Sequence, residues 1–147
     1  MKNSEIAVRC FRDDYNCTQS VLTPFAEELG LDRDLAFKIA CGFGAGMGRM
    51  QEVCGAVTGA FMVIGLKHGK AKKEDNHLKE KTYGLVKQFS ENFKKINGTI
   101  NCKELLGCDL NTVEGRAAFK AGNMVSTVCE RCVRDSVDIL EQLLRDL

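Results

Sequence analysis

Apolar side chains recur at every third or fourth position along the last segment of the chain, residues 125–147. Charged side chains such as Arg131, Asp135 and Glu141 occupy positions between them. This spacing matches the repeat of an α-helix and predicts one amphipathic helix over 125–147. Its apolar positions are Val125, Val128, Cys129, Cys132, Val133, Val137, Leu140, Leu143, Leu144 and Leu147.

Three further helices are predicted from periodicity and from end signals. Apolar side chains at helical spacing indicate a helix over 83–96, which stops at Gly98 because glycine readily ends a helix. Asp32 is a favoured N-cap residue and predicts a helix that ends at Gly42. Asn111, also of a capping type, predicts the start of another helix.

The remaining segments give weaker signals. Thr23 as N-cap, followed by Pro24 as first helical residue, predicts two short helices or one kinked helix after Cys17. The longest apolar run, 54–66, is shorter than the roughly 20 residues that a membrane helix needs, so it predicts a buried core helix. The charged segment 69–76 predicts a surface loop.

Together these elements predict an all-α fold, because no regular alternation of apolar and polar residues marks a strand. The length of 147 residues is typical of one domain. We therefore expect residues 1–147 to form a single compact helical bundle of about five to seven helices. An apolar face that the last helix leaves exposed would favour a homodimer.

Composition and charge narrow the classes of function. The chain has 21 basic and 20 acidic residues, a net charge of +1, which argues against binding nucleic acid or an anionic membrane through a strong field. The first residues hold no apolar run of the secretory type, so we expect a cytoplasmic protein. In a reducing compartment, eight cysteines indicate metal ligands or redox groups rather than structural disulfides.

Three cysteines are predicted at helix starts. Cys17 follows the capping residue Asn16, Cys54 opens the central apolar helix, and Cys102 follows Asn101. At a helix start, free N–H groups and the positive end of the dipole favour a thiolate, which is the nucleophilic and metal-binding form. Several helix starts that converge would also suit an anionic iron–sulfur cluster.

The other cysteines are less distinctive. Free cysteines are often buried as small apolar groups, and we interpret Cys10, Cys41, Cys108 and Cys132 in that way. Cys129 and Cys132 form a C-x-x-C whose side chains share one helix face, so this pair could supply two ligands, or one ligand and a resolving thiol.

Glycines near these cysteines are candidate contacts of a bound group. The segment from Gly42 to Gly48 lacks the spacing of a phosphate-binding loop, so its glycines are better explained by a tight turn and close backbone approach to a packed site. Gly44, Gly46 and Gly55 are the residues that we expect beside a cofactor.

Five motifs occur in a recognisable order: residues 16–22, 42–48, 54–60 and 102–107, and then Cys129 with Val133. In this order they resemble the C_GCAxxG_C_C family of redox-active proteins, and the resemblance extends from about residue 11 to the end of the chain. It implies that Cys17, Cys54, Cys102 and Cys129 are the four signature cysteines, as catalytic residues or as metal ligands.

The chain is also similar to the cluster-bearing part of split-Soret cytochromes, which implies an iron–sulfur site. It has no C-x-x-C-H, so covalent haem is not indicated. Thr18 stands where the family commonly has alanine.

Three hypotheses follow. In the first, the four cysteines hold an iron–sulfur cluster or another metal centre that exchanges electrons with a redox partner. In the second, they form reversible disulfides and no metal is bound. In the third, the chain is a helical interaction protein whose cysteines are structural.

Overall fold

The computed structural model describes residues 1–145, and within them the predicted all-α fold is confirmed. These residues contain no β-strand, and Val53 and Asn101 form an isolated bridge. The helices outnumber the predicted five to seven because α4 and α7 are short, separate turns. In chain order the elements are α1 (Asn3–Arg12), α2 (Cys17–Ala26), α3 (Arg33–Cys41), α4 (Gly44–Met47), α5 (Gly55–His68), α6 (Asn76–Asn97), α7 (Cys102–Leu106), α8 (Val113–Ala121), the π-helix η1 (Val125–Cys129) and α9 (Glu130–Arg145).

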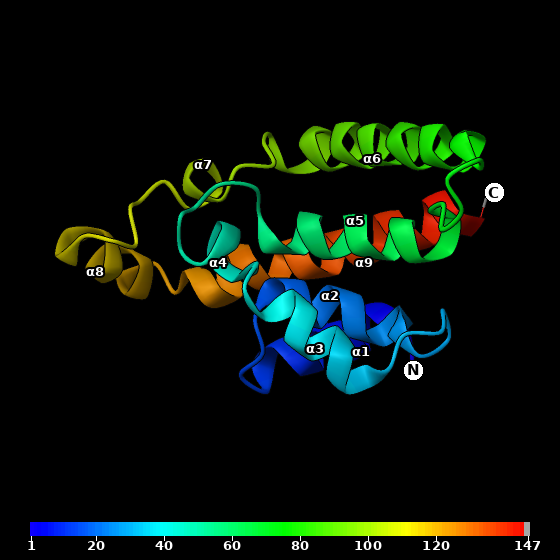
Figure 1. The fold of residues 1–147 in the computed structure, drawn as a ribbon. Helices are drawn as coiled ribbons and strands as arrows, with labels where there is room; N and C mark the ends of the chain where they lie inside the picture. The colour runs from blue at the N-terminus through cyan, green and yellow to red at the C-terminus, as the bar shows by residue number, and fades with distance from the viewer. Residues whose placement is uncertain (146–147) are drawn as a thin grey trace.

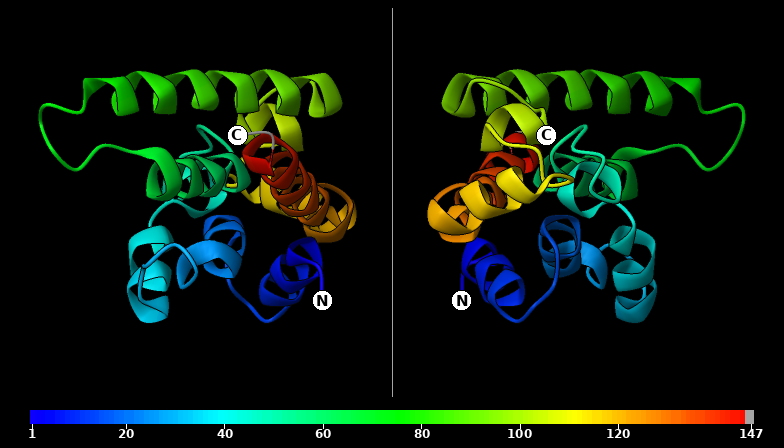
Figure 2. Two further views of the ribbon diagram at one scale, coloured as in Figure 1. Left: turned by 90° about the vertical axis from the view of Figure 1, so that its right-hand side faces the viewer. Right: turned by 90° about the vertical axis from the view of Figure 1, so that its left-hand side faces the viewer.

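The helices form three layers (Figures 1 and 2). Helices α5 and α9 make the middle layer, α6 lies on one side of them, and α1, α2 and α3 lie on the other. The largest fully buried side chains, Phe89 and Phe93, come from α6 and pack with Ile64 of α5 and Leu140 of α9. Helix α8 projects beyond the end of the layers at which α4 and α7 lie (Figure 1).

Several predicted helix ends are confirmed. Asn16 caps α2 through a capping box with Gln19, and the Asp32 side chain accepts a hydrogen bond from the N–H of Leu35 at the start of α3. Helix α6 ends at Asn97, and Gly98 follows with a left-handed backbone. These ends depend on local hydrogen bonds, which is why the sequence predicts them well.

Two predicted helix starts are wrong. Thr23 does not begin a helix, because α2 continues through Pro24 to Ala26. Both sides of the proline carry buried residues, so the packing of α2 holds the helix together despite the missing N–H. The N-cap of α8 is Thr112 rather than Asn111, and its hydroxyl accepts a hydrogen bond from the N–H of Gly115.

The final amphipathic segment is confirmed as helical, but its first turn is not α-helical. Residues 125–129 form the π-helix η1, and α9 then runs from Glu130 to Arg145, while residues 146–147 lie outside the described residues. The apolar face of α9 packs against α1, α2, α5 and α6. Between Cys132 and Leu144 that face is therefore covered mainly within the chain, so these described residues give no support to the homodimer that an exposed face would favour.

The central apolar run is confirmed as a core helix, α5. Its contact with α2 is the most extensive contact between two helices within residues 1–145. Among residues 1–145, no helix combines the length and the apolar character that crossing a membrane requires. Residues 69–75 connect α5 to α6 as a largely exposed loop, as the charged sequence predicts.

Close approach of α2 to α5 depends on glycine. A β-carbon on Gly59 would lie 2.9 Å from the carbonyl oxygen of Thr18 and 3.1 Å from Cβ of Val21. At Gly65, six residues further along α5, a β-carbon would have no neighbouring atom within 4 Å. The two glycines therefore differ in packing, although both lie inside one helix.

We predict opposite effects for the same substitution at these two sites. Gly59→Ala should lower the free energy of unfolding by about 1–3 kcal/mol, because backbone atoms of α2 must move away. Gly65→Ala should raise it by about 0.4–1 kcal/mol, because alanine restricts the unfolded chain. Urea unfolding of both variants checks this, and equal effects at the two sites would contradict the packing described.

Candidate functional site

Five of the eight cysteines surround one cavity of about 170 Å³. Cys17, Cys54, Cys102 and Cys129 are brought together there, as the family resemblance requires, and Cys132 joins them. The cavity lies where the first turns of α2, α5 and α7 meet the junction of η1 with α9. The rest of the wall is mostly apolar, and it consists of Phe11, Asn16, Ala45, Gly55, Leu105, Leu106, Leu110, Phe119, Val125 and Val128.

Cys17 and Cys54 reach the cavity because two helix starts meet. Cys17 is the first residue of α2, and Cys54 is the N-cap of α5. A β-carbon on Gly55 would lie 2.7 Å from Oγ1 of Thr18 and 3.1 Å from Cβ of Cys17. Gly55 thus lines the cavity, and its lack of a side chain sets the spacing between the two cysteines.

Cys102 is held by a short backbone pairing. The N–H of Cys102 donates to the carbonyl of Glu52 (2.6 Å), and the N–H of Cys54 donates to the carbonyl of Ile100 (2.7 Å). Asn101 caps α7 by accepting a hydrogen bond from the N–H of Glu104. Two cysteines that are distant in the sequence are therefore fixed side by side by main-chain bonds.

Cys129 and Cys132 come from the irregular start of the last helix. Cys129 is the last residue of η1, and Cys132 lies in the first turn of α9 with 1% of its surface exposed. A π turn contains an extra residue relative to an α-helix and is often found at functional sites. Here it lies in the segment that carries Val125, Val128 and Cys129 into the cavity wall.

The glycine-rich segment packs behind the cavity in a strained conformation. Residues 45–49 all have φ between 55° and 67°, a left-handed backbone that costs about 1–2 kcal/mol for each non-glycine residue. A β-carbon on Gly44 would lie 2.5 Å from Nδ2 of Asn16, and one on Gly46 would lie 2.8 Å from Cβ of Cys102. Gly44 and Gly46 therefore pack against residues that carry the cysteines, while Ala45 lines the cavity.

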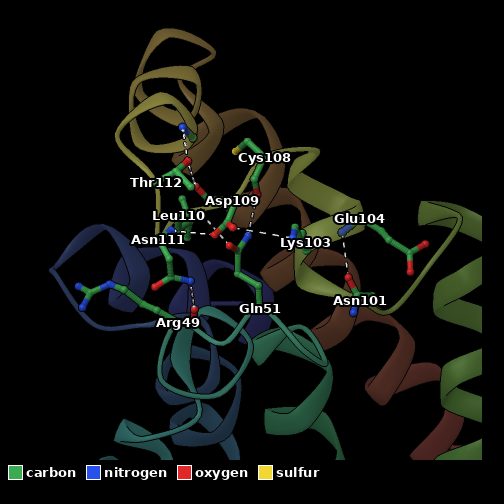
Figure 3. Close-up of polar contacts among 11 residues, drawn as sticks. Arg49, Gln51, Asn101, Lys103, Glu104, Cys108, Asp109, Leu110, Asn111 and Thr112 are labelled. Atoms are coloured by element: carbon green, nitrogen blue, oxygen red, sulfur yellow. Dashed lines mark hydrogen bonds and ion pairs between the residues drawn. The ribbon is translucent and has the colours of Figure 1, made fainter.

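Gln51, at the end of this segment, is a site residue that the sequence did not single out. Its buried side chain donates to the carbonyl of Cys108 (2.9 Å) and accepts from the N–H of Leu110 (2.7 Å), as Figure 3 shows. Gln51 also partly opposes the rise in the pKa of the Cys102 thiol that burial causes. Gln51 thus ties the glycine-rich segment and Cys102 to the loop after α7.

The first pair of thiols is Cys17 and Cys129. A hydrogen bond between the two sulfurs, together with burial, raises the pKa of Cys17 well above its ordinary value. The same hydrogen bond lowers the pKa of Cys129. Cys129 is therefore the more acidic thiol of this pair.

The second pair is Cys54 and Cys132. The hydrogen bond from Cys132 is the main cause of a lowered pKa at Cys54, and the N–H groups of Ala56 and Val57 lower it further. The pKa of Cys132 is raised by the same hydrogen bond and by burial. Cys102 belongs to neither pair, and burial raises its pKa to about 12.

The three cysteines outside the cavity are not core residues, which corrects the prediction. Cys41 is exposed, while Cys10 and Cys108 are half-buried. Cys10 lies 3.7 Å from the hydroxyl of Thr23, and Cys108 lies 4.0 Å from the sulfur of Met124. Cys132 is buried in the core as predicted, but it also faces the cavity.

All eight cysteines are free thiols. Within residues 1–145, no group of three or more His, Cys, Asp or Glu side chains is arranged to hold a metal ion. The five sulfurs instead surround a space, so their arrangement can serve as paired dithiols or as donors to a group that fills the cavity.

The fold and the site define an all-α protein built around a buried set of cysteine thiols. Residues 15–143 match the model of a family described as "Putative redox-active protein (C_GCAxxG_C_C)", and the chain belongs to this family. The family resemblance of the motifs is therefore confirmed. No curated protein and no solved structure gives a significant match to the chain.

The Cys17–Cys129 hydrogen bond predicts a pH effect. A lower pKa leaves more Cys129 as thiolate at neutral pH, and the thiolate is the form that is alkylated. Cys17→Ala removes the hydrogen bond, so the pKa of Cys129 should rise and its labelling curve should move to higher pH. Iodoacetamide labelling of Cys129 in reduced, metal-free protein at pH 7 should slow by roughly tenfold for each unit of pKa increase.

The matched control is Cys41→Ala, which removes an exposed thiol away from the cavity. It should leave the labelling curve of Cys129 unchanged. Identical Cys129 curves for the two variants would contradict the pairing of Cys17 with Cys129.

Proposed function

We propose that this redox protein transfers electrons through an iron–sulfur cluster held in the cavity by Cys17, Cys54, Cys102 and Cys129. The observation that carries the proposal is the convergence of these four thiols on one cavity. Thiolates are the usual ligands of such clusters, and the family description supports redox activity. When bound, the cluster would supply one-electron chemistry that cysteine alone does not.

The donor set favours a group larger than one ion. The cysteine sulfurs line a space of about 170 Å³, and no cluster of ligating side chains within residues 1–145 is arranged for a metal ion as it stands. A cluster of several iron and sulfide ions spans such a gap, because each iron takes its own cysteine. An iron–sulfur cluster therefore fits this wall better than a lone zinc ion.

The surrounding residues have defined tasks in this proposal. The N–H groups near Cys54 stabilise negative charge on its sulfur, which favours the reduced, more negative state of the centre. Phe11, Leu105 and Phe119 in the wall limit the access of water. The protein would work in a reducing compartment such as the cytoplasm, where thiols persist, and would exchange electrons with a separate redox partner.

The second candidate is a thiol–disulfide reaction without metal, which the hydrogen-bonded pair Cys17 and Cys129 favours. The Cys129 thiolate would attack a substrate disulfide and release one substrate thiol. Cys17 would then lose its proton and attack the Cys129 sulfur, which releases the second substrate thiol and leaves a Cys17–Cys129 disulfide. The substrate is reduced by the two electrons that the protein thiols lose.

Anaerobic purification tests the first candidate. We expect bound iron and acid-labile sulfide, and a visible absorption band that weakens when dithionite is added. Alanine at any one of the four signature cysteines should remove most of the iron, since each contributes a ligand. Iron and sulfide analysis with an absorption spectrum measures this.

The control is Cys10→Ala, which changes a half-buried cysteine outside the cavity and should retain the iron. Protein that contains no iron and takes up none on reconstitution would rule out the cluster. If a Cys17–Cys129 disulfide then forms in oxidised protein, the second candidate stands. If replacing the cysteines alters only stability, the cysteines are structural.

A further inference from the structure

Helix α8 is attached to the rest of the molecule by few contacts, and yet it contributes to the wall of the cysteine cavity. Within residues 1–145 it makes no extensive contact with any other helix, and it projects beyond the end of the three layers (Figure 1). Of its nine residues only Gly115 is buried and only Phe119 is half-buried, and Phe119 lines the cavity. A helix with so few buried side chains opens locally far more readily than a core helix.

The first turn of α8 is fixed to the body of the protein. Thr112 caps the helix by accepting a hydrogen bond from the N–H of Gly115 (2.9 Å), and a β-carbon on Gly115 would lie 1.6 Å from the carbonyl oxygen of Asp109. The side chain of Asn111 donates to the carbonyl of Arg49 (2.9 Å), as Figure 3 shows. This turn can therefore act as a pivot for the rest of α8.

The other end of α8 continues into an exposed connection. All residues from 120 to 127 except Met124 are exposed, and Met124 is half-buried with its sulfur 4.0 Å from that of Cys108. Asn123 has a left-handed φ of 48°, and its carbonyl accepts a hydrogen bond from the hydroxyl of Thr127 (3.1 Å). Because this connection is bonded largely to itself, it can change conformation without exposing the core.

We propose that α8 is a lid on the cysteine cavity, which opens about its first turn and closes when Phe119 packs into the cavity wall. Opening exposes the cysteines to molecules larger than water, and closing places apolar side chains over them again. For the proposed function the lid would be the route by which the cavity is filled, and only this use of the lid rests on that function. The opening itself depends on how weakly α8 is packed, whichever group the thiols hold.

Phe119 is the side chain that holds the lid closed. It is the largest apolar side chain of α8, whereas Val113 of the same helix is 71% exposed. Packing Phe119 into the wall removes apolar surface from water and favours the closed state. Removing the ring should raise the open fraction roughly fivefold to tenfold, which corresponds to about half the transfer free energy of a fully buried phenylalanine.

Labelling of Cys54 under native conditions tests the lid in the unaltered chain. Cys54 is 6% exposed, and trypsin isolates it on residues 50–67. Reduced, metal-free protein is treated with N-ethylmaleimide at urea concentrations below the unfolding transition, and the digest is analysed by mass spectrometry. Lid opening exposes little surface, so the labelling rate should change little with urea. A rate with the full urea dependence of global unfolding overturns the inference.

Phe119→Ala tests the latch, with Val113→Ala as the matched control on the same helix. Phe119→Ala should label Cys54 roughly fivefold to tenfold faster than wild type, while Val113→Ala should label it at the wild-type rate. If Phe119→Ala does not fold, Phe119→Leu should give a smaller acceleration, because it keeps part of the apolar surface. Equal rates in the folded Phe119 and Val113 variants would mean that reagents reach Cys54 by another route, and the lid would be wrong.

Hydrogen exchange in wild-type protein decides the same question without a variant. The amides of α8 should exchange faster than those of α9, because α8 opens without the core. Protection of α8 equal to that of α9 would contradict a lid.

The outcome is independent of the cluster, because all three experiments use metal-free protein. Protein that binds iron but labels Cys54 only on global unfolding would contradict the lid alone. Protein that binds no iron but labels Cys54 through lid opening would contradict the cluster alone.

Discussion

Helices α2 and α5 approach each other along Gly55 and Gly59, where a β-carbon would overlap atoms of Thr18. This contact sets the distance between Cys17 at the start of α2 and Cys54 at the start of α5. The buried hydroxyls of Thr18 and Thr58 lie 3.4 Å apart within the same interface. The cavity therefore exists because small residues allow two helix starts to meet, and the remaining cysteines are brought to that point.

The irregular parts of the backbone lie around the place where the starts of α2 and α5 meet. The left-handed segment 45–49 packs against Cys102, Gly44 before it packs against Asn16, and the π turn of η1 precedes α9 at Cys129. Strained backbone persists only where surrounding contacts hold it, and it is concentrated at functional sites. Gln51 supplies such contacts, since its side chain joins the strained segment to the loop that follows α7. The regular helices provide the core, and the irregular turns position the thiols.

The sequence predicted features that depend on neighbouring residues. Asn16 and Asp32 cap helices by bonding to N–H groups three residues away, so their roles are visible locally. The helix start predicted at Thr23 and Pro24 was wrong, because tertiary packing on both sides of Pro24 outweighs the missing hydrogen bond. The sequence also did not predict the π turn at residues 125–129, because its apolar spacing is close to that of an α-helix.

Only part of the cysteine cavity could be predicted from the sequence, because the rest depends on how distant helices pack. Helix starts and motif order identified Cys17, Cys54, Cys102 and Cys129, and the fold gathers all four. The entry of Cys132 into the cavity depends on how α9 packs against α5, which no local pattern records.

We propose that the cysteine cavity is the redox centre and that iron binds there. Diffraction from anaerobically grown crystals, recorded on both sides of the iron absorption edge, locates the iron. An anomalous iron signal is expected inside the cavity, within bonding distance of Cys17, Cys54, Cys102 and Cys129. An iron signal elsewhere on the chain, or none in protein that is coloured in solution, would contradict it.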